Sequence, residues 1–259
     1  RYARDRDTLR TLFIGGGGYI FPRYIRARWP GSLVQVAEID PVVTQAAVEA
    51  LGLDPAEVRI LASQDGPVEE PAGGSDAGSR PMYVYHLDAR NHVDDLLRRK
   101  RAGESVEPFD FVYGDAFNDF SVPYHLVTLE FTEKVRELLR PATGIYLLNV
   151  IDTYASAEFV GSVYCTFRAV FGDNAYVFVT DEDGPSDDPD QRDTFVVIGA
   201  LQSLELSDLD FPTVADVEVP SLLDPEHLRI LGEKAAGRIL TDDYAPVENL
   251  LEAVLKTRY

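Results

Sequence analysis

The chain alternates short apolar runs with amphipathic stretches, a pattern typical of strands and helices that follow one another around a mostly parallel sheet. The apolar runs predict strands at residues 9–14, 32–39, 83–87, 109–113, 145–150, 176–180 and 194–198. The amphipathic stretches predict helices at residues 19–29, 41–51, 91–101, 126–139, 155–170 and 225–233, with another near 247–255. We therefore predict an α/β fold with a doubly wound, mostly parallel sheet and an antiparallel closing strand.

Two segments interrupt this alternation. Residues 62–81 are rich in Gly, Ser, Pro, Asp and Glu and cannot bury enough apolar surface to fold alone, so they are expected to form a surface insertion. Residues 181–193 form an acidic loop that joins the last two predicted strands. We expect residues 1–200 to form one α/β domain, with residues 201–259 as a C-terminal extension packed on the same domain.

The charge of the chain limits its partners. Its 44 acidic and 24 basic side chains give a formal net charge of -20, which repels phosphate backbones and anionic membrane surfaces. We therefore predict that the chain does not bind nucleic acid. The same field attracts cations and suits an amine substrate, although composition alone favours the simpler interpretation that the acids keep the surface solvated.

Three further absences bear on membrane contact, cellular location and metal binding. No apolar run approaches the roughly 20 residues that span a bilayer, so no membrane contact by this chain is expected. The lone Cys165 cannot form an internal disulfide, and a cytoplasmic location is expected. The four histidines do not form a recognised metal-binding spacing, which predicts that no metal is bound.

A run of glycines follows the first predicted strand. Gly15, Gly16, Gly17 and Gly18 lie between that strand and a helix, where backbone without Cβ atoms can approach a ligand closely and a helix N-terminus offers amides. The run lacks the spacing of a Gly-x-Gly-x-x-Gly dinucleotide fingerprint. A structural turn without a ligand is the alternative.

Acids follow the second and third strands of this region. Glu38 lies where a carboxylate can accept both hydroxyls of a ribose, and Asp40 is placed to cap the next helix. Asp88, which precedes Ala89, can accept the amino group of an adenine or cap the helix that follows, and the sequence favours neither interpretation. Carboxyl ends of parallel strands are where such sheets bind ligands.

Two more acids follow the strand at residues 109–113. Asp115 emerges directly after this buried strand, and Asp119 comes four residues later. A carboxylate in this position can take a proton from an alkylammonium or orient a neutral amine for attack. Asp115 is therefore the best catalytic candidate. The alternative is an acidic turn in which Asp119 caps a helix.

Five segments together resemble the spermidine synthase (polyamine aminopropyltransferase) family in order and spacing, and bacterial spermidine-synthase-like domains most closely. They are residues 13–18, 36–40, 87–90, 113–116 and 122–131, and the similarity extends over residues 9 to 200. The resemblance implies a methyltransferase-type Rossmann-like fold that binds decarboxylated S-adenosylmethionine. It also implies transfer of an aminopropyl group to putrescine or a related small amine, and a homodimer.

The resemblance also implies roles for individual residues. Carried over by position, Gly15, Gly16 and Gly17 face the nucleoside, Glu38 the ribose, Asp88 and Ala89 the adenine, Asp115 is the base, and Asp119 and Tyr124 contact the amine. One departure concerns the glycine run, where the family has an aspartate that contacts an amine and this chain has Gly18 and Tyr19. Two alternatives remain, a small-molecule methyltransferase that uses intact S-adenosylmethionine and a noncatalytic module that binds the nucleoside or a polyamine.

Overall fold

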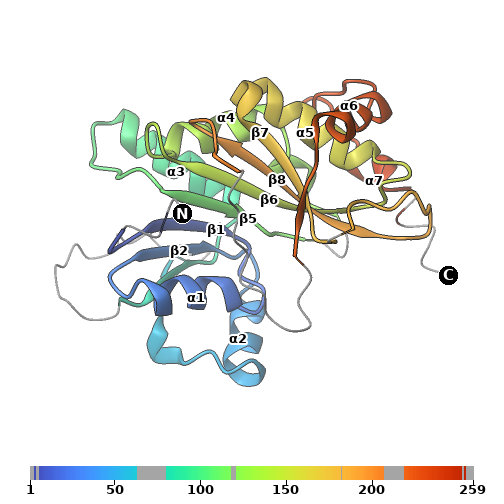
Figure 1. Cartoon of the computed structure of the whole chain (residues 1–259). Coiled ribbons are helices and arrows are strands. Elements are labelled where there is room, and N and C mark those ends of the chain that lie inside the picture. Colours follow the sequence, from blue (N-terminus) through green and yellow to red (C-terminus); the bar gives the residue numbers. More distant parts are fainter. Residues whose placement is uncertain are drawn as a thin grey trace. The chain divides into compact units, whose positions relative to one another are not determined.

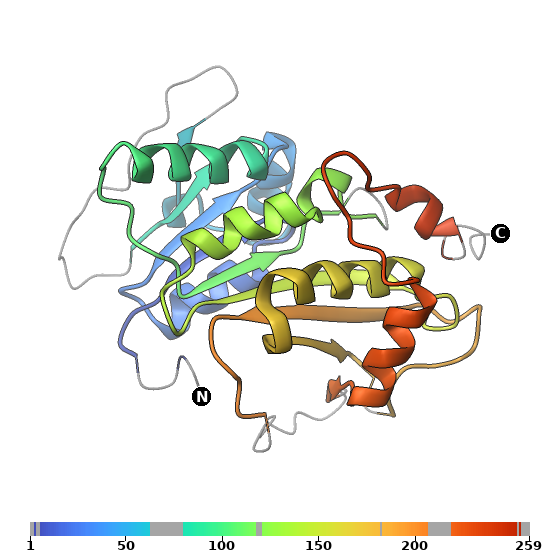
Figure 2. The ribbon, with the colours of Figure 1, turned by 90° about the horizontal axis from the view of Figure 1, so that it is seen from above.

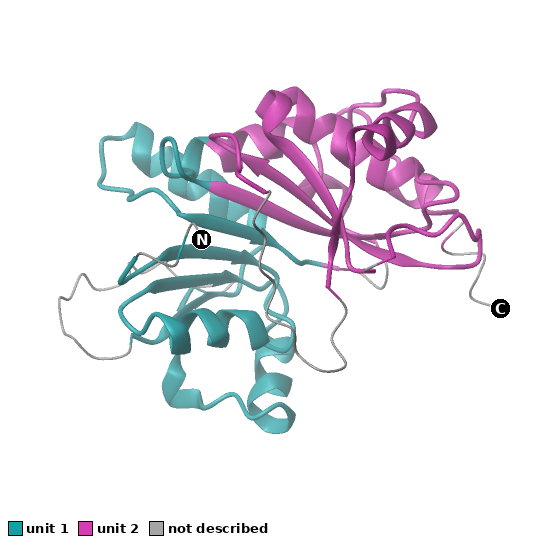
Figure 3. Cartoon of the chain, in the orientation of Figure 1, with its two compact units in different colours: residues 1–116, 137–144 teal, residues 117–136, 145–259 magenta. Residues whose placement is uncertain are grey.

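The computed structural model describes residues 3, 6–62, 80–117, 121–181, 183–206, 219–252 and 254. The chain divides into two compact units, shown in Figure 3. The first comprises residues 1–116 and 137–144, and the second comprises residues 117–136 and 145–259. The division predicted at residue 200 concerns a different boundary and stays a prediction.

The first unit is a parallel sheet with helices between its strands (Figure 1). Its elements are β1 Arg10–Ile14, α1 Ile20–Arg28, β2 Leu33–Ala37, α2 Pro41–Ala50, η1 Pro55–Glu57, β3 Val58–Ala62, β4 Met82–Tyr85, α3 Ala89–Arg101 and β5 Phe111–Gly114. Its described strands lie in the order β3-β4-β2-β1-β5, and each neighbouring pair is parallel. Helices α1 and α2 lie on one face of this sheet and α3 on the other (Figures 1 and 2), as predicted for a doubly wound fold.

Strands β1, β2 and β4 of this sheet are buried on both faces, which explains their nearly continuous apolar sequences. All five residues of β2 are buried. Along β4, Val84 packs in the core cluster on one face and Tyr85 in the cluster on the other. The predicted cap of α2 is confirmed, because the Asp40 carboxylate accepts a hydrogen bond from the backbone N–H of Val42 at 2.9 Å.

Strand β3 was not predicted from the sequence. It pairs in parallel with β4 at the edge of the sheet, and its register shifts between Ile60 and Ala62. Arg59 and Ile60 are exposed while Leu61 and Ala62 are buried, so the segment has no strict alternation of polar and apolar residues. The insertion predicted at 62–81 differs at its first residue, since Ala62 ends β3, while β4 begins at Met82 directly after the predicted end; residues 63–79 lie outside the described part of the chain.

The second unit contains an antiparallel sheet. Its elements are η2 Tyr124–Leu126, α4 Leu129–Leu138, β6 Ile145–Asp152, α5 Glu158–Phe171, η3 Gly172–Asn174, β7 Ala175–Val179, β8 Asp193–Ala200, β9 Ser221–Leu222, α6 Pro225–Lys234 and α7 Val247–Leu250; the last two residues of α4 fall in the first unit. The strands lie in the order β6-β8-β7-β9, and neighbours are antiparallel. The predicted closing pair of strands is confirmed by the pairing of β7 with β8.

Two predicted helices of this unit differ from the observed ones. The helix predicted at 126–139 begins instead at Leu129, because the Thr128 hydroxyl accepts a hydrogen bond from the N–H of Phe131 and so caps the helix. The helix predicted near 247–255 is observed as the four residues of α7, followed by a turn at Leu251, after which Glu252 and Val254 are again helical.

Helices α5 and α6 pack closely in the second unit. A Cβ atom on Gly161 would lie 2.3 Å from the carbonyl oxygen of Leu231, so glycine is required for this approach. The fully buried Asp152 accepts hydrogen bonds from the N–H groups of Phe159 and Val160 at the start of α5, and burial raises its pKa to about 7. None of the helices within the described residues is long and apolar enough to cross a lipid bilayer.

Candidate functional site

The carboxyl ends of four parallel strands meet at one edge of the first unit's sheet. Ile14 of β1 is in register with Ala37 of β2 and with Gly114 of β5, and Ala37 is in register with Tyr85 of β4. The residues that follow these four positions therefore emerge side by side; they are Gly15, Glu38, His86 and Asp115. The structure thus brings together the glycine turn and the acids at 38 and 115, as the sequence predicted.

Gly15 and Gly16 allow two close approaches of the glycine turn. Gly15 has a φ of +95°, and a Cβ atom there would lie 2.5 Å from the carbonyl oxygen of Asp115. A Cβ atom on Gly16 would lie 2.8 Å from the ring of Tyr19. Gly17 has a φ of +48°, and a Cβ atom there would meet no atom of the described residues within 4 Å, so its backbone conformation is what favours glycine. Glycine at 15 therefore determines how near the turn lies to the catalytic candidate.

Glu38 joins the end of β2 to the glycine turn. One of its carboxylate oxygens accepts a hydrogen bond from the N–H of Gly16 at 2.8 Å, and the other accepts one from the N–H of Asp40 at 2.9 Å. Glu38 is 7% exposed. A carboxylate has about four lone-pair sites, so these two amides orient it and leave acceptor capacity for the hydroxyls of a ribose.

Asp88 caps helix α3, one of the two interpretations that the sequence left open. Its Oδ1 accepts hydrogen bonds from the N–H groups of Arg90 at 2.8 Å and Asn91 at 3.3 Å. Ala89 is the buried first residue of this helix. Both residues lie beyond the carboxyl end of β4, at the same edge as Glu38, and their predicted contact with adenine stays a prediction.

The residues expected to act on the amine are Asp115, Asp119 and Tyr124. Asp115 directly follows β5, and its backbone N–H donates to the carbonyl of Ile14 at 2.8 Å, so its backbone is fixed while the residue itself is exposed. Asp119 lies outside the described residues. Tyr124 belongs to the second unit, where it is 53% exposed in η2.

A buried chain of polar side chains supports this edge of the sheet, and the sequence did not predict it. The hydroxyl groups of Tyr19 and Thr44 lie 2.7 Å apart, and the Thr44 hydroxyl lies 3.0 Å from Nε2 of His86. Burial raises the pKa of Tyr19 to about 12 and lowers the pKa of His86. Tyr19 is fully buried, and its ring packs against Gly16 of the glycine turn.

Two features of the sequence explain why this buried series of polar side chains was not predicted. Tyr19 adopts a left-handed backbone conformation with a φ of +57°, which is unusual for tyrosine. No pattern of apolar and polar residues predicts this conformation. Thr44 is a polar residue on a helix face and gives no signal by itself.

Among the described residues, no group of three or more His, Cys, Asp or Glu side chains is arranged to hold a metal ion.

A glycine turn and a strand-end carboxylate at the carboxyl edge of a parallel sheet define the class of protein. The arrangement is that of the α/β fold shared by S-adenosylmethionine-dependent methyltransferases and spermidine synthases, and solved structures bear this out. Human methyltransferase-like protein 13 in complex with SAH has a TM-score of 0.51 and 18% identity, over 94% of this chain and 89% of that one.

Comparison with further proteins is more specific. The chain is 27% identical over 254 residues to a polyamine aminopropyltransferase from Vibrio vulnificus, a match that covers 94% of this chain and 70% of that protein. A probable spermidine synthase from Corynebacterium glutamicum has a TM-score of 0.62 at 18% identity, over 93% of this chain and 75% of that one. Spermidine synthase from Thermotoga maritima has a TM-score of 0.52 at 15% identity, over 88% and 68%.

No protein-family model matches the chain. The predicted resemblance to the spermidine synthases and polyamine aminopropyltransferases is nevertheless confirmed by the sequence relative, and the predicted fold is confirmed by the solved structures.

Proposed function

We propose that the chain is a polyamine aminopropyltransferase that moves an aminopropyl group from decarboxylated S-adenosylmethionine to putrescine or a related small amine. The observation that carries this proposal is the similarity to a polyamine aminopropyltransferase over 94% of the chain. A methyltransferase is not favoured, because the fold is common to both classes and the sequence relative is an aminopropyltransferase.

The nucleoside of the donor is assigned to the carboxyl edge of the first unit. Glu38 is oriented by the N–H groups of Gly16 and Asp40 and would accept the ribose hydroxyls. Gly15, Gly16 and Gly17 would face the nucleoside, with Asp88 and Ala89 beside the adenine. Because these groups are already held by backbone contacts, binding would require little further ordering of the chain.

The bound donor would supply a sulfonium whose propyl carbon is open to displacement. In the transfer, the amine nitrogen forms a bond to that carbon as the carbon–sulfur bond breaks, and the sulfur leaves as the thioether of methylthioadenosine. The attacking primary ammonium must first lose a proton to expose its lone pair, and Asp115 would accept that proton and pass it to solvent. Asp115 would also align the attacking amine, since a carboxylate attracts the cationic form and orients the neutral one.

Asp119 and Tyr124 are assigned to the amine only by the family resemblance. The net charge of -20 supports a cationic substrate, because it concentrates polyamines near the protein.

No metal is proposed for the reaction, so a chelator should leave the rate unchanged. A homodimer stays a proposal from the family resemblance, and light scattering in solution would test it. A cytoplasmic location also stays a proposal.

The test is direct. The protein is incubated with decarboxylated S-adenosylmethionine and putrescine, spermidine or cadaverine, and the release of methylthioadenosine is measured. Amine-dependent release supports the proposal. Absence of product with every amine, in a preparation that binds the nucleoside, contradicts it and supports a noncatalytic module. Methylated amine from intact S-adenosylmethionine would contradict it in favour of a methyltransferase.

A further inference from the structure

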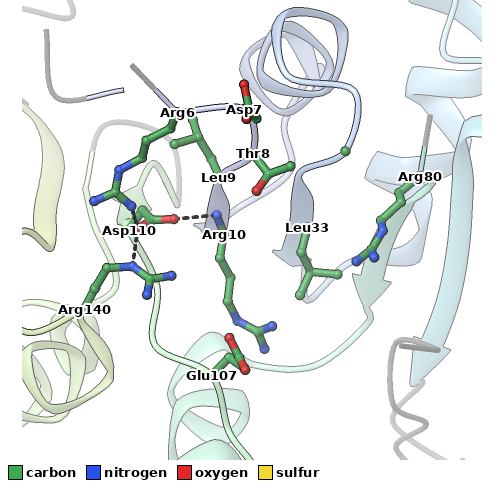
Figure 4. A pocket seen from close by; sticks show the side chains of 11 residues that line it. Arg6, Asp7, Thr8, Leu9, Arg10, Leu33, Arg80, Glu107, Asp110 and Arg140 are labelled. Carbon is green, nitrogen blue, oxygen red and sulfur yellow. Dashed lines mark hydrogen bonds and ion pairs between the residues drawn. The ribbon is translucent and has the colours of Figure 1, made fainter. Parts of the chain in front are cut away.

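A hollow lies at the edge of the first unit's sheet opposite the glycine turn. It is a cavity of about 540 Å³ near the amino ends of β1 and β2, as Figure 4 shows. Arg10, which begins β1, lines this cavity, whereas Gly15, which follows β1, belongs to the candidate nucleoside site. The cavity and the candidate nucleoside site are therefore separated by the length of a strand. A cavity of this volume can hold a small molecule.

A buried carboxylate forms one wall of this cavity. Asp110 is 3% exposed and receives hydrogen bonds from the side chains of Arg6 and Arg140 and from the backbone N–H of Arg10 at 2.8 Å. Two guanidinium groups share this one carboxylate, so the cluster of Arg6, Asp110 and Arg140 carries one excess positive charge. An excess charge that is partly removed from water favours a nearby anion.

Two further arginines and two further acids line the cavity. Figure 4 shows the side chains of Arg10 and Arg80 extending along the cavity, from the start of β1 and from the segment before β4. The described lining has four arginines (Arg6, Arg10, Arg80 and Arg140) against three acids (Asp7, Glu107 and Asp110). Asp7 and Glu107 are exposed, so water screens them more than it screens Asp110. This concentration of cations contrasts with the chain as a whole, whose net charge is -20.

We propose that this cavity binds a small anion that carries a phosphate group. Guanidinium groups present planar forks of N–H donors that match the oxygens of phosphate, and several of them around one cavity neutralise a doubly charged group better than one could. The three acids in the lining weaken the field, so the affinity should be modest, with a Kd on the order of 1 mM or below.

The binding experiment uses the whole protein and two probes. Inorganic phosphate and glycerol phosphate are titrated by calorimetry, with sodium chloride keeping the ionic strength constant. Saturable binding of phosphate alone would identify the free ion as the ligand, and tighter binding of glycerol phosphate would identify a phosphorylated metabolite. Either result supports the proposal. Binding of neither probe in excess of chloride overturns it.

Variants locate the site. Arg80→Gln is expected to weaken binding about tenfold, because it removes a charged donor from the cavity. Arg10→Gln should act similarly and serves as a second test if one variant folds poorly. Arg98→Gln is the matched control, since that side chain is 75% exposed on α3. Unchanged affinity in well-folded Arg80→Gln and Arg10→Gln proteins would overturn the assignment.

A competition experiment separates this cavity from the glycine turn, which could also attract an anion at the start of α1. Phosphate and methylthioadenosine should bind independently if the phosphate lies at the amino edge of the sheet. Mutual exclusion of the two ligands would place the phosphate at the nucleoside site and contradict the proposal. The result does not depend on whether the chain transfers aminopropyl groups.

Discussion

The two edges of the first unit's sheet use carboxylates in opposite ways. At the amino edge, Asp110 is bound by the side chains of Arg6 and Arg140 and so ties together three segments that are far apart in the sequence. At the carboxyl edge, Glu38 and Asp88 are held by backbone N–H groups. Amides orient a carboxylate without cancelling its full charge, whereas guanidinium groups neutralise it. The carboxylate at the amino edge therefore serves stability, whereas the carboxylates at the carboxyl edge keep the charge that binding requires, and five predictions test this difference.

The largest effect is expected at Asp115. Asp115→Asn keeps the shape of the side chain but removes the proton acceptor, so turnover should fall by about 10²- to 10⁴-fold. Nucleoside affinity and the thermal midpoint should change little, because the residue is exposed. Release of methylthioadenosine measures turnover, and Asp173→Asn, whose side chain is fully exposed, is the control. Unchanged turnover would remove Asp115 from the chemistry.

At Asp110 we expect a loss of stability instead of a loss of turnover. Asp110→Ala leaves two guanidinium groups without their shared carboxylate, and removing one partner of a buried ion pair destabilises by about 3–5 kcal/mol. Urea unfolding would measure this change. Glu104→Ala is the matched control, because Glu104 pairs with Arg99 at the surface with its side chain 52% exposed, and such pairs contribute at most about 1 kcal/mol. Equal losses would show that the amino edge is not stabilised by this cluster.

Glycines at the two edges provide a third comparison. Gly15→Ala would force a left-handed alanine against the backbone of Asp115, at a cost of roughly 2–4 kcal/mol. At the amino edge, a Cβ atom on Gly31 would meet, among the described residues, only the Thr8 side-chain methyl, at 2.8 Å, and Thr8 is exposed and can rotate. Gly31→Ala should therefore cost less than about 1 kcal/mol. Unfolding experiments on the two variants should differ clearly.

A smaller effect is expected at Glu38. Glutamine has one acceptor oxygen and one NH₂ group, so Glu38→Gln would turn a donor toward the N–H of either Gly16 or Asp40. Nucleoside affinity should fall about tenfold, as expected for loss of a charged hydrogen-bond acceptor. Glu49→Gln on the exposed face of α2 is the control. Equal affinities in the two variants would exclude Glu38 from the nucleoside site.

The smallest effect concerns pH. Burial lowers the pKa of His86 in the folded chain, so below the ordinary histidine pKa the unfolded chain binds more protons than the folded one. The stability that this neutral histidine contributes is present above about pH 6.5 and is lost as the pH falls. The arginines of the amino edge do not titrate in this range. Thermal midpoints between pH 5 and 7.5 should show a slope that His86→Gln reduces, and an unchanged slope would contradict this assignment.

Local patterns predicted much of the candidate site. Glu38 and Asp115 each follow a buried strand directly, so their place at the sheet edge could be read from the chain. Asp88 could not be resolved, because a cap and a ligand contact require the same residue at the same point, and the structure shows the cap. The edge strand β3 was not predicted, since its sequence does not alternate strictly between polar and apolar residues. In the structure the neighbours Arg59 and Ile60 are both exposed.

The sequence by itself determined the alternation of strands and helices and the chemical groups at the strand ends, because both depend on residues close together in the chain. Only the tertiary structure decided that Ile14, Ala37, Tyr85 and Gly114 share one register, and therefore that the groups after them converge. It also decided that Asp110 meets Arg10 across a separation of 100 residues. Such pairings depend on how distant segments pack, which no local pattern of polar and apolar residues specifies.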